Sequence, residues 1–462
     1  MIRLFRVSIP SSSVALVLSE TILILSCYLL AAYATLDVSS DIFLWEDGGW
    51  WRVFLVVLLI FLGLYFHDLY DTYRIPSRTV LIQQFCFVLG IAFLVQALLS
   101  YGRWDIMVPR RIMLYGSVLV LGLAPLWRIV FTDTVRRAQG AQKVLFLGTS
   151  PAVHEIIATF RERPELGMMP IGFLGVDDRL ETLDGVPCLG SVDGLRAAVA
   201  ELQPDRIVVG MKERRNALPI EQLLDLRFAG VQIEDSAATY ETVFHRVSIR
   251  ELRPSQLVFS AELGPQPTMV ATQAMYSWIL GLAGFIIGLP LMVAVALAVK
   301  LFSKGPVFYR QTRVGRGGVP FTLYKFRSMY PDAEVKSGAV WATKDDPRVT
   351  PIGRWLRKLR LDEMPQLFNV IRGDMSLVGP RPERPEFVQM LQEKIPYYRQ
   401  RSCVKPGVTG WAQINHKYGD TVEDVTIKLE YDLYYIKNLA PSLDAYILFH
   451  TAKTVLLGRG AQ

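Results

Sequence analysis

Four long apolar runs lie in the first third of this 462-residue sequence, at residues 14–36, 51–66, 80–100 and 112–127. The first run carries a single charge, Glu20, and at about 1.5 Å per residue it exceeds the roughly 30 Å hydrocarbon layer of a bilayer. It is also too long for the core of a signal peptide. The pattern predicts four transmembrane helices. For Glu20, a polar contact with a neighbouring helix is favoured over a functional role.

Lys and Arg are distributed unevenly around these runs. Arg3 and Arg6 precede the first run and residues 128–143 are basic, whereas residues 37–47 contain four acids and no Lys or Arg. Basic flanks favour the cytoplasm, so the N-terminus and the chain from residue 128 onward are expected there. The loop 103–111 is also basic and would then lie outside, against this rule.

Residues 143–262 alternate apolar, strand-like segments with helical ones. The expected strands are residues 143–148, 171–176, 206–210 and 231–235, with a helix at 151–162 after the first. This alternation is typical of a doubly wound, Rossmann-like parallel sheet. Gly148 is followed by Thr149, Ser150 and Pro151, where a GxGxxG fingerprint needs further glycines. A degenerate fold used for regulation or pairing is therefore favoured over a dinucleotide site.

A fifth apolar run, residues 274–299, has no charged residue and is long enough to cross a bilayer. Pro290 lies in it, and a proline inside a helix removes a hydrogen bond and kinks the axis. A true span would place residues 303–462 outside the cell. We expect instead a re-entrant helix, broken at Pro290, that enters and leaves by the cytoplasmic face, with a fifth span as the alternative.

Composition and charge support a membrane protein with one basic part. Hydrophobic residues make up 51% of the chain, and the net charge is +7. Residues 301–405 hold 20 of the 50 Lys and Arg residues but 10 of the 43 acids, so this segment carries the whole basic excess. Nucleic acid, anionic lipid or phosphorylated substrates could explain it, and the neighbouring apolar runs favour the last two.

The metal-binding side chains are scattered. The four cysteines form no CxxC pair and the five histidines show no ligand spacing, which argues against a disulfide framework or a zinc site. A metal in this chain is expected to be a hard, oxygen-bound cation such as Mg²⁺.

Adjacent carboxylates, Asp362 and Glu363, are the candidate chemistry of the basic segment. Apolar residues at helical spacing run from Leu361 to a stop at Gly373, so both acids are expected near a helix start, where anions are favoured. Basic residues flank the pair on both sides: Arg357, Lys358, Arg360, Arg372, Arg381 and Arg384. One carboxylate can hold a cation while the other attacks phosphorus. An ordinary acid pair at a helix start is the alternative.

A β-hairpin is expected before this pair. The segment after residue 304 combines a short β-rich stretch, a glycine turn and a second such stretch, and it would present Arg310, Arg313, Lys325 and Arg327 beside the membrane surface. Lys and Arg side chains in such a position can clamp phosphoryl groups.

Four motifs in this region resemble a known family. They are GPVFYRQTRVG (305–315), KFRSM (325–329), LDEMPQLFNVIRGDMSLVGPRP (361–382) and KPGVTGWAQI (405–414). Together they resemble the bacterial sugar transferases called monotopic phosphoglycosyl transferases. The four apolar runs and the Rossmann-like part resemble the large branch of polyisoprenyl-phosphate hexose-1-phosphate transferases, which starts exopolysaccharide chains.

The resemblance implies a multi-pass protein of the bacterial inner membrane. We expect a four-helix transmembrane region with a basic linker at 1–142 and the Rossmann-like domain at 143–262. A linker and the re-entrant helix would follow at 263–302, and a cytoplasmic α/β catalytic domain at 303–462. The implied reaction transfers a sugar-1-phosphate from a UDP-sugar to undecaprenyl phosphate and releases UMP. Membrane lipid is an expected partner, nucleic acid is not, and a homodimer is left open.

The resemblance also implies roles for individual residues. Asp362 would be the nucleophile that forms an aspartyl phosphosugar, and Glu363 would hold Mg²⁺. Pro382 would shape a phosphate-binding turn. The cations expected to bind substrate are Lys325, Arg327, Arg357, Arg381 and Arg384. Cations beside a carboxylate also favour its ionised form, so we expect them to lower the pKa of Asp362.

Several positions depart from the family pattern or stay open. Leu289 precedes Pro290 where the family usually has serine, and His416 and Lys417 replace the usual Gly-Arg. Asp432 matches a family position, as does Tyr435, and a salt bridge or a site contact would explain Asp432 equally. The run 443–457 fits either a helix at the membrane interface or a core helix.

Two other functions compete with this interpretation. A Leloir-type glycosyltransferase would transfer the sugar without its phosphate. A non-catalytic, membrane-anchored scaffold would only bind anionic lipid, but lipid binding needs charge alone and does not require an Asp-Glu pair. The sequence does not identify the sugar.

Overall fold

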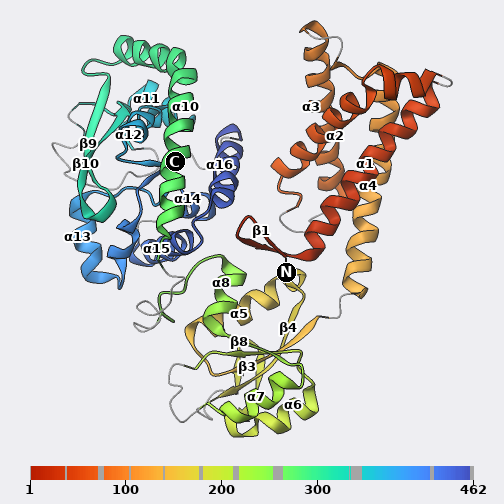
Figure 1. Ribbon diagram of the computed structural model, residues 1–462, viewed down its shortest axis with the longest axis vertical. Helices are drawn as coiled ribbons and strands as arrows, with labels where there is room; N and C mark the ends of the chain where they lie inside the picture. The colour runs from red at the N-terminus through yellow and green to blue at the C-terminus, as the bar shows by residue number, and fades with distance from the viewer. Residues whose placement is uncertain are drawn as a thin grey trace.

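The computed structural model describes residues 2–36, 39–70, 78–102, 106–138, 141–175, 181–211, 218–252, 264–331, 333, 346–416 and 421–457. Lys417 lies outside these residues. Figure 1 shows a helical N-terminal bundle, a middle domain built on a sheet, and a C-terminal domain. A short hairpin of β1 (Ile2–Leu4) and β2 (Val7–Ile9) precedes the bundle.

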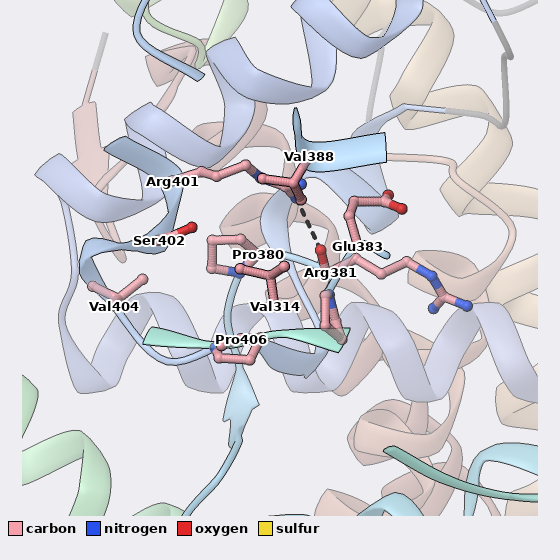
Figure 2. A pocket seen from close by; sticks show the side chains of 11 residues that line it. Val314, Pro380, Arg381, Glu383, Val388, Arg401, Ser402, Val404 and Pro406 are labelled. Carbon is pink, nitrogen blue, oxygen red and sulfur yellow. Dashed lines mark hydrogen bonds between the residues drawn. The ribbon is translucent and has the colours of Figure 1, made fainter. Parts of the chain in front are cut away.

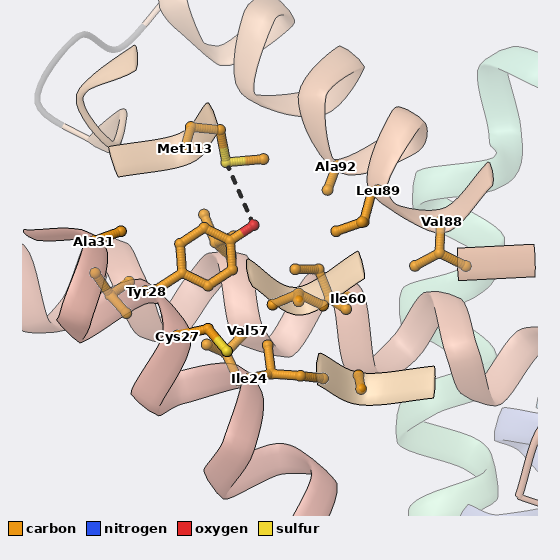
Figure 3. Packing of buried hydrophobic residues seen from close by; sticks show 14 of the residues in the cluster. Ile24, Cys27, Tyr28, Ala31, Val57, Ile60, Val88, Leu89, Ala92 and Met113 are labelled. Atoms are coloured by element: carbon orange, nitrogen blue, oxygen red, sulfur yellow. Dashed lines mark hydrogen bonds between the residues drawn. The ribbon is translucent and has the colours of Figure 1, made fainter. Parts of the chain in front are cut away.

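Four helices form the bundle: α1 (Ser11–Leu36), α2 (Gly49–Phe66), α3 (Arg78–Gly102) and α4 (Arg110–Ala138), with a π-helical turn, η2 (Ile42–Glu46), between the first two. Each of the four is long and apolar enough to cross a membrane, as predicted. Side chains such as Ile24, Tyr28 and Ile60 pack inside the bundle (Figure 3). Leu94 and Leu98 are among the large apolar side chains exposed outside it. Helices that are apolar on every face are typical of membrane spans.

Glu20 and Arg128 form an ion pair inside this bundle. Arg128 donates from Nε to Oε1 of Glu20 at 2.8 Å and from Nη2 to Oε2 at 2.7 Å. Its remaining nitrogen, Nη1, donates to the carbonyl of Leu69, and the guanidinium lies over the Tyr70 ring. Both partners are buried. Glu20 thus faces a neighbouring helix, as the sequence favoured.

We expect Glu20→Leu to lower the free energy of unfolding by about 3–5 kcal/mol, because it leaves the Arg128 charge buried without its partner. The double variant Glu20→Leu with Arg128→Met should recover most of this loss, since it removes both charges. Unfolding in detergent, followed by the loss of helical circular dichroism, measures both changes. A single variant as stable as the native chain would show that the pair is not needed.

The middle domain contains a six-stranded sheet in the order β5-β6-β4-β3-β7-β8. Its strands are β3 (Gln142–Leu147), β4 (Met168–Gly175), β5 (Thr182–Leu183), β6 (Val186–Ser191), β7 (Arg206–Val209) and β8 (Gln232–Asp235). All neighbours pair in parallel except β5 with β6. The predicted Rossmann-like sheet is confirmed.

Helices cover both faces of this sheet. One core contains α5 (Pro151–Glu162) and α8 (Ser236–Phe244), and the other contains α6 (Leu195–Leu202) and α7 (Ile220–Phe228). Two short 3₁₀ turns, η4 (Pro164–Leu166) and η5 (Val192–Gly194), join the elements. Gly148 follows β3 with φ +87°, and a Cβ there would meet the carbonyl oxygen of Gly210 at 2.7 Å. The first strand therefore ends in a turn that needs glycine.

The C-terminal domain is mainly helical around two small sheets. Its helices are α10 (Pro267–Phe302), α11 (Pro351–Lys358), α12 (Gln366–Arg372), α13 (Pro385–Lys394), α14 (Trp411–Asn415), α15 (Val422–Lys437) and α16 (Pro441–Leu456). Three 3₁₀ turns are η6 (Arg316–Gly318), η7 (Leu361–Glu363) and η8 (Tyr398–Cys403). Strands β9 (Phe308–Val314) and β10 (Pro320–Phe326) pair antiparallel, and β11 (Ser376–Val378) and β12 (Gly407–Thr409) pair in parallel. Helices and strands thus combine in this domain, and among the described residues the strands form these two small sheets.

Helix α10 contains Pro290 and turns sharply near one end (Figure 1). Before the proline, Gly281 and Gly288 face the α12 region, where a Cβ would meet Val370 and Met364 within 3 Å. After the proline, Val299 packs in a cluster with Phe326 and Leu356. Both arms of α10 therefore lie against the same C-terminal domain.

The C-terminal domain also contacts the bundle and the middle domain. Val7 of the N-terminal hairpin lies in its core, and the Tyr434 hydroxyl donates to the carbonyl of Arg6 at 2.6 Å. Leu443 and Ile447 are fully buried, so the first half of α16 is a core helix. Farther along, Lys453 pairs with Asp68 at 2.6 Å at the end of α2. The last helix thus joins the C-terminal domain to the membrane bundle.

Candidate active site

The two adjacent acids lie on η7, between α11 and α12. Thr350 caps α11 by accepting a hydrogen bond from the Gly353 amide, and Arg360 takes a left-handed conformation, φ 54°, that turns the chain into η7. Helix α12 then runs to Gly373, whose φ of 89° ends it. The acids therefore precede the helix start by one short turn. Asp362 and Glu363 are 7% and 9% exposed, so neither is a solvated surface acid.

Three cations surround the Glu363 carboxylate. Lys325 Nζ donates to Oε1 at 2.7 Å, and Arg381 Nη2 donates to the same oxygen at 2.8 Å. Arg360 Nη1 lies 3.7 Å from Oε2. Burial alone would raise the pKa of Glu363, but Arg381 and Lys325 outweigh it and hold that pKa well below its usual range. Glu363 is therefore ionised at neutral pH.

Asp362 has a different environment, although it is the next residue. Among the described residues, its carboxylate has no hydrogen-bond or ion-pair partner. Burial raises the pKa of Asp362, Lys325 opposes this, and the charge on Glu363 adds to it. Our expectation that the cations lower this pKa is wrong, because desolvation of a buried carboxylate exceeds the attraction of cations held mainly by its neighbour.

Lys325 reaches the acids because of the strand register. In the β9–β10 hairpin it pairs with Tyr309 and lies near the end of β10. Asn369, fully buried on α12, donates from Nδ2 to the carbonyl of Thr322 at 2.7 Å and accepts from the amide of Tyr324 at 3.1 Å. These two bonds fix α12 against β10 and so fix the distance between the acids and Lys325. No pattern in the sequence indicated this role of Asn369.

The other cations predicted in the hairpin point elsewhere. Arg327 is buried and donates to the carbonyls of Ser303 and Lys304, so it holds the end of α10 and does not contact the acids. Arg310 lies over the Tyr324 ring on the opposite face of the hairpin. Arg313 donates to the carbonyl of Pro382 at 3.0 Å. One of the four predicted cations, Lys325, therefore contacts the acids directly.

The remaining predicted residues surround the site. Arg357, on α11, lies close enough to oppose the rise in the pKa of Asp362. Pro382 lies in the turn between β11 and α13, immediately after Arg381. Arg384 occupies the N-cap position of α13, and its side chain lies 3.8 Å from Glu386. Pro290 lies two residues beyond Gly288, which faces Met364 beside the acids.

A small, open pocket adjoins the turn that carries Arg381. Val314, Pro380, Arg401 and Pro406 are among its lining residues, and Figure 2 shows them around the turn. Arg401 is partly buried and pairs with Asp432 at 2.9 Å, so Asp432, whose role the sequence left open, forms a salt bridge. His416 pairs with Asp424 at 3.2 Å and contacts neither acid. No pattern in the sequence indicated a role for Arg401 in the site.

Glu363 provides a carboxylate oxygen that could serve as a magnesium ligand. Within the described residues, no three His, Cys, Asp or Glu side chains gather as a ligand set. Magnesium, however, commonly binds one or two carboxylates together with substrate phosphates and water. Arg360 lies 3.7 Å from Oε2 of Glu363, too far for a good hydrogen bond, so this oxygen can coordinate a metal ion. The residues therefore fit Mg²⁺ bound jointly by protein and substrate.

Comparison with known proteins places this site in a family. The bacterial sugar transferase family matches residues 269–458, and a family described as a CoA-binding domain matches residues 65–224. A UDP-N-acetylgalactosamine-undecaprenyl-phosphate N-acetylgalactosaminephosphotransferase of Aeromonas hydrophila is 45% identical over 48% of this chain, and the match spans about half, 52%, of that relative.

Two further relatives match more of their length. UDP-glucose:undecaprenyl-phosphate glucose-1-phosphate transferases of Xanthomonas campestris and Klebsiella pneumoniae are 34% and 30% identical to this chain. The matches cover 69% and 88% of this chain, and 68% and 94% of the relatives. The resemblance drawn from the motifs is confirmed, and the chain belongs to the bacterial sugar transferase family, a family of phosphoglycosyl transferases.

Proposed function

We propose that this protein transfers a sugar-1-phosphate from a UDP-sugar to undecaprenyl phosphate, through a covalent intermediate on Asp362, as the first membrane step of exopolysaccharide synthesis. One observation carries the proposal: of two adjacent buried carboxylates, Glu363 is held by cations and Asp362 has no partner among the described residues. An unpartnered, poorly solvated carboxylate beside cations is suited to attack phosphorus.

The reaction proceeds in two displacements. An oxygen of Asp362 attacks the sugar-bearing phosphorus, and the bond from this phosphorus to the bridging oxygen breaks, so UMP leaves with that oxygen. A phosphate oxygen of undecaprenyl phosphate then attacks the same phosphorus and releases the Asp362 carboxylate. Lys325 and Arg381, already at Glu363 Oε1, provide positive charge where the diphosphate must approach. Mg²⁺, when bound at Glu363, supplies further charge to neutralise the phosphates.

The proposal is tested by the nucleotide that the reaction releases. The named relatives act on UDP-N-acetylgalactosamine and UDP-glucose, so these two donors are the first to screen with undecaprenyl phosphate. We expect UMP as the nucleotide product. Release of UDP would identify a Leloir-type glycosyltransferase, and release of neither nucleotide across a panel of UDP-sugars would support a lipid-binding scaffold.

We further propose that α10 is re-entrant and that the C-terminal domain lies on the cytoplasmic face of the inner membrane. In support, Gln273 near the start of α10 donates to the carbonyl of Val378, and Ser303 at its end accepts from Arg327. Both ends of α10 thus bind one domain, which a helix that crosses the bilayer could not easily allow. Cysteines placed at Thr268 and Lys304 should both be labelled from the cytoplasm, and labelling of the pair from opposite sides would contradict the proposal.

The pH dependence of the reaction should reflect the buried nucleophile. Asp362 must be ionised to attack, and its pKa is raised above the ordinary 3.8. Activity should therefore fall as the pH drops through the raised pKa of Asp362, which lies above 3.8. This fall would form the acidic limb of a plot of kcat/KM against pH. Lys325 favours ionised Asp362, so any residual activity of Lys325→Ala should show this limb at higher pH. A limb that moves to lower pH in this variant would contradict the assignment.

A further inference from the structure

Two partly buried arginines, Arg401 and Arg313, hold the backbone of the turn that carries Arg381. Arg401 Nη2 donates to the carbonyl of Arg381 at 2.9 Å, the bond drawn in Figure 2, and Arg313 Nη1 donates to the carbonyl of Pro382 at 3.0 Å. The amide of Val314 donates to the next carbonyl, that of Glu383, at 2.9 Å. Three consecutive carbonyls are thus held from outside the turn, by groups on η8 and β9.

Arg401 is itself held in a single orientation. Nε and Nη2 both lie near Oδ2 of Asp432, at 3.1 and 2.9 Å, and Nη1 donates to the Tyr398 hydroxyl at 2.7 Å. The Arg401 side chain is 11% exposed and that of Asp432 is 3% exposed. A planar guanidinium can satisfy a carboxylate, a hydroxyl and a carbonyl together, which a lysine ammonium on a flexible stem cannot do in the same geometry.

Burial and pairing act differently on the two partners of this ion pair. Burial raises the pKa of Asp432 to about 6, although Arg401 opposes the rise. A carboxyl group whose pKa is higher in the folded chain than in the unfolded chain is less favourable in its ionised form after folding. Burial would lower the pKa of the Arg401 guanidinium, but Tyr398 and Asp432 outweigh it and raise that pKa, so both partners are ionised at neutral pH.

The hydrogen bond from Arg401 restrains the main chain that carries the Arg381 side chain. Its guanidinium donates to Glu363 Oε1 at 2.8 Å, while its own carbonyl accepts from Arg401. The position of the main chain at residue 381 thus sets where the guanidinium meets the acids. A misplacement of about 1 Å at a reacting centre can cost about 10²-fold in rate.

We infer that Arg401, oriented by Asp432, is a positioning residue that aims Arg381 at Glu363 and the substrate diphosphate. This inference rests on the proposed function. It assigns Asp432 to the reaction through Arg401 and Arg381, without contact to substrate.

A double-mutant cycle tests this inference. Arg401→Lys should lower kcat for UMP release by about 10- to 100-fold with a smaller change in KM, because the misplaced Arg381 stabilises the transition state less well. In an Arg381→Ala background the same Arg401→Lys change should have little further effect on kcat, since the group that it positions is absent. Tyr398→Phe, which removes one partner of Arg401 and leaves the ion pair, should show the same pattern with a smaller loss.

The controls separate folding from positioning. Arg399→Lys, an exposed arginine two residues away on η8, is the matched control and should keep wild-type kcat. If Arg401→Lys does not fold, Tyr398→Phe replaces it in the double-mutant cycle with Arg381→Ala. If the double variant is folded and active, and its loss in kcat equals the product of the losses of Arg401→Lys and Arg381→Ala, the inference is overturned and Arg401 is a structural residue. Wild-type protein that releases no UMP would instead refute the proposed function itself.

Discussion

Asp362→Asn is expected to abolish turnover, with a loss of UMP release of about 10⁴-fold or more, as is usual when a nucleophile is removed. The amide has almost the same shape as the carboxylate, so the η7 turn should persist. It carries no charge, however, and cannot form the acyl phosphate on which the first displacement depends. Release of UMP from UDP-sugar with undecaprenyl phosphate measures the effect.

The matched control for this variant is Glu386→Gln, which neutralises an exposed acid on α13 in the same domain. This control should keep wild-type activity, because Glu386 contacts Arg384 and not the acids on η7. Near-normal UMP release by folded Asp362→Asn would show that the reaction does not use a covalent aspartyl step.

Lys325→Ala should lower UMP release by about 10²- to 10³-fold, the range found when one preorganised charge or donor is removed from a reacting centre. Two effects add in this variant. The diphosphate loses a neutralising cation, and the ionised form of Asp362 loses the cation that most opposes its raised pKa. Steady-state rates at several pH values separate the two, since a higher pH restores the second effect and not the first.

The fold should tolerate Lys325→Ala. The lysine side chain is partly exposed, and Glu363 keeps Arg381 at the same oxygen. Lys358→Ala is the matched control, because Lys358 is exposed on α11 and its ammonium lies over the Trp355 ring. An unfolded Lys325→Ala protein would show that Lys325 is structural, and unchanged activity would remove it from the site.

Most of the architecture could be predicted from local patterns. The four N-terminal helices follow from apolar length, and the middle sheet follows from alternating segments, because both signals are carried by residues close in sequence. The C-terminal domain was harder to predict. Its strands are short, and β11 and β12 pair across about 30 residues, so their partners depend on the tertiary fold.

The site was predicted in outline and not in detail. The acid pair and its cationic surroundings were visible in the sequence, and Lys325 and Arg381 contact Glu363 as the charge pattern suggested. The sequence could not show that Arg327 turns to the end of α10, because that contact depends on where α10 ends in space. Nor could it show the raised pKa of Asp362, since burial is a property of the folded chain.

The same reason explains the residues that sequence reasoning missed. Asn369 and Arg401 act by donating to main-chain carbonyls of distant segments, at Thr322 and Arg381. Such acceptors exist at every position of a chain, so no residue type or spacing marks them in advance. Structure is needed to show which carbonyl a buried donor reaches.

The covalent step at Asp362 is the centre of the proposed reaction. Incubation of the protein with a UDP-sugar in the absence of undecaprenyl phosphate should trap the first intermediate, and mass spectrometry of the digested protein can locate it. We predict a phosphosugar on the peptide that contains Asp362, with the mass shift on that aspartate and an equal amount of UMP released. An adduct on any other residue would contradict the account.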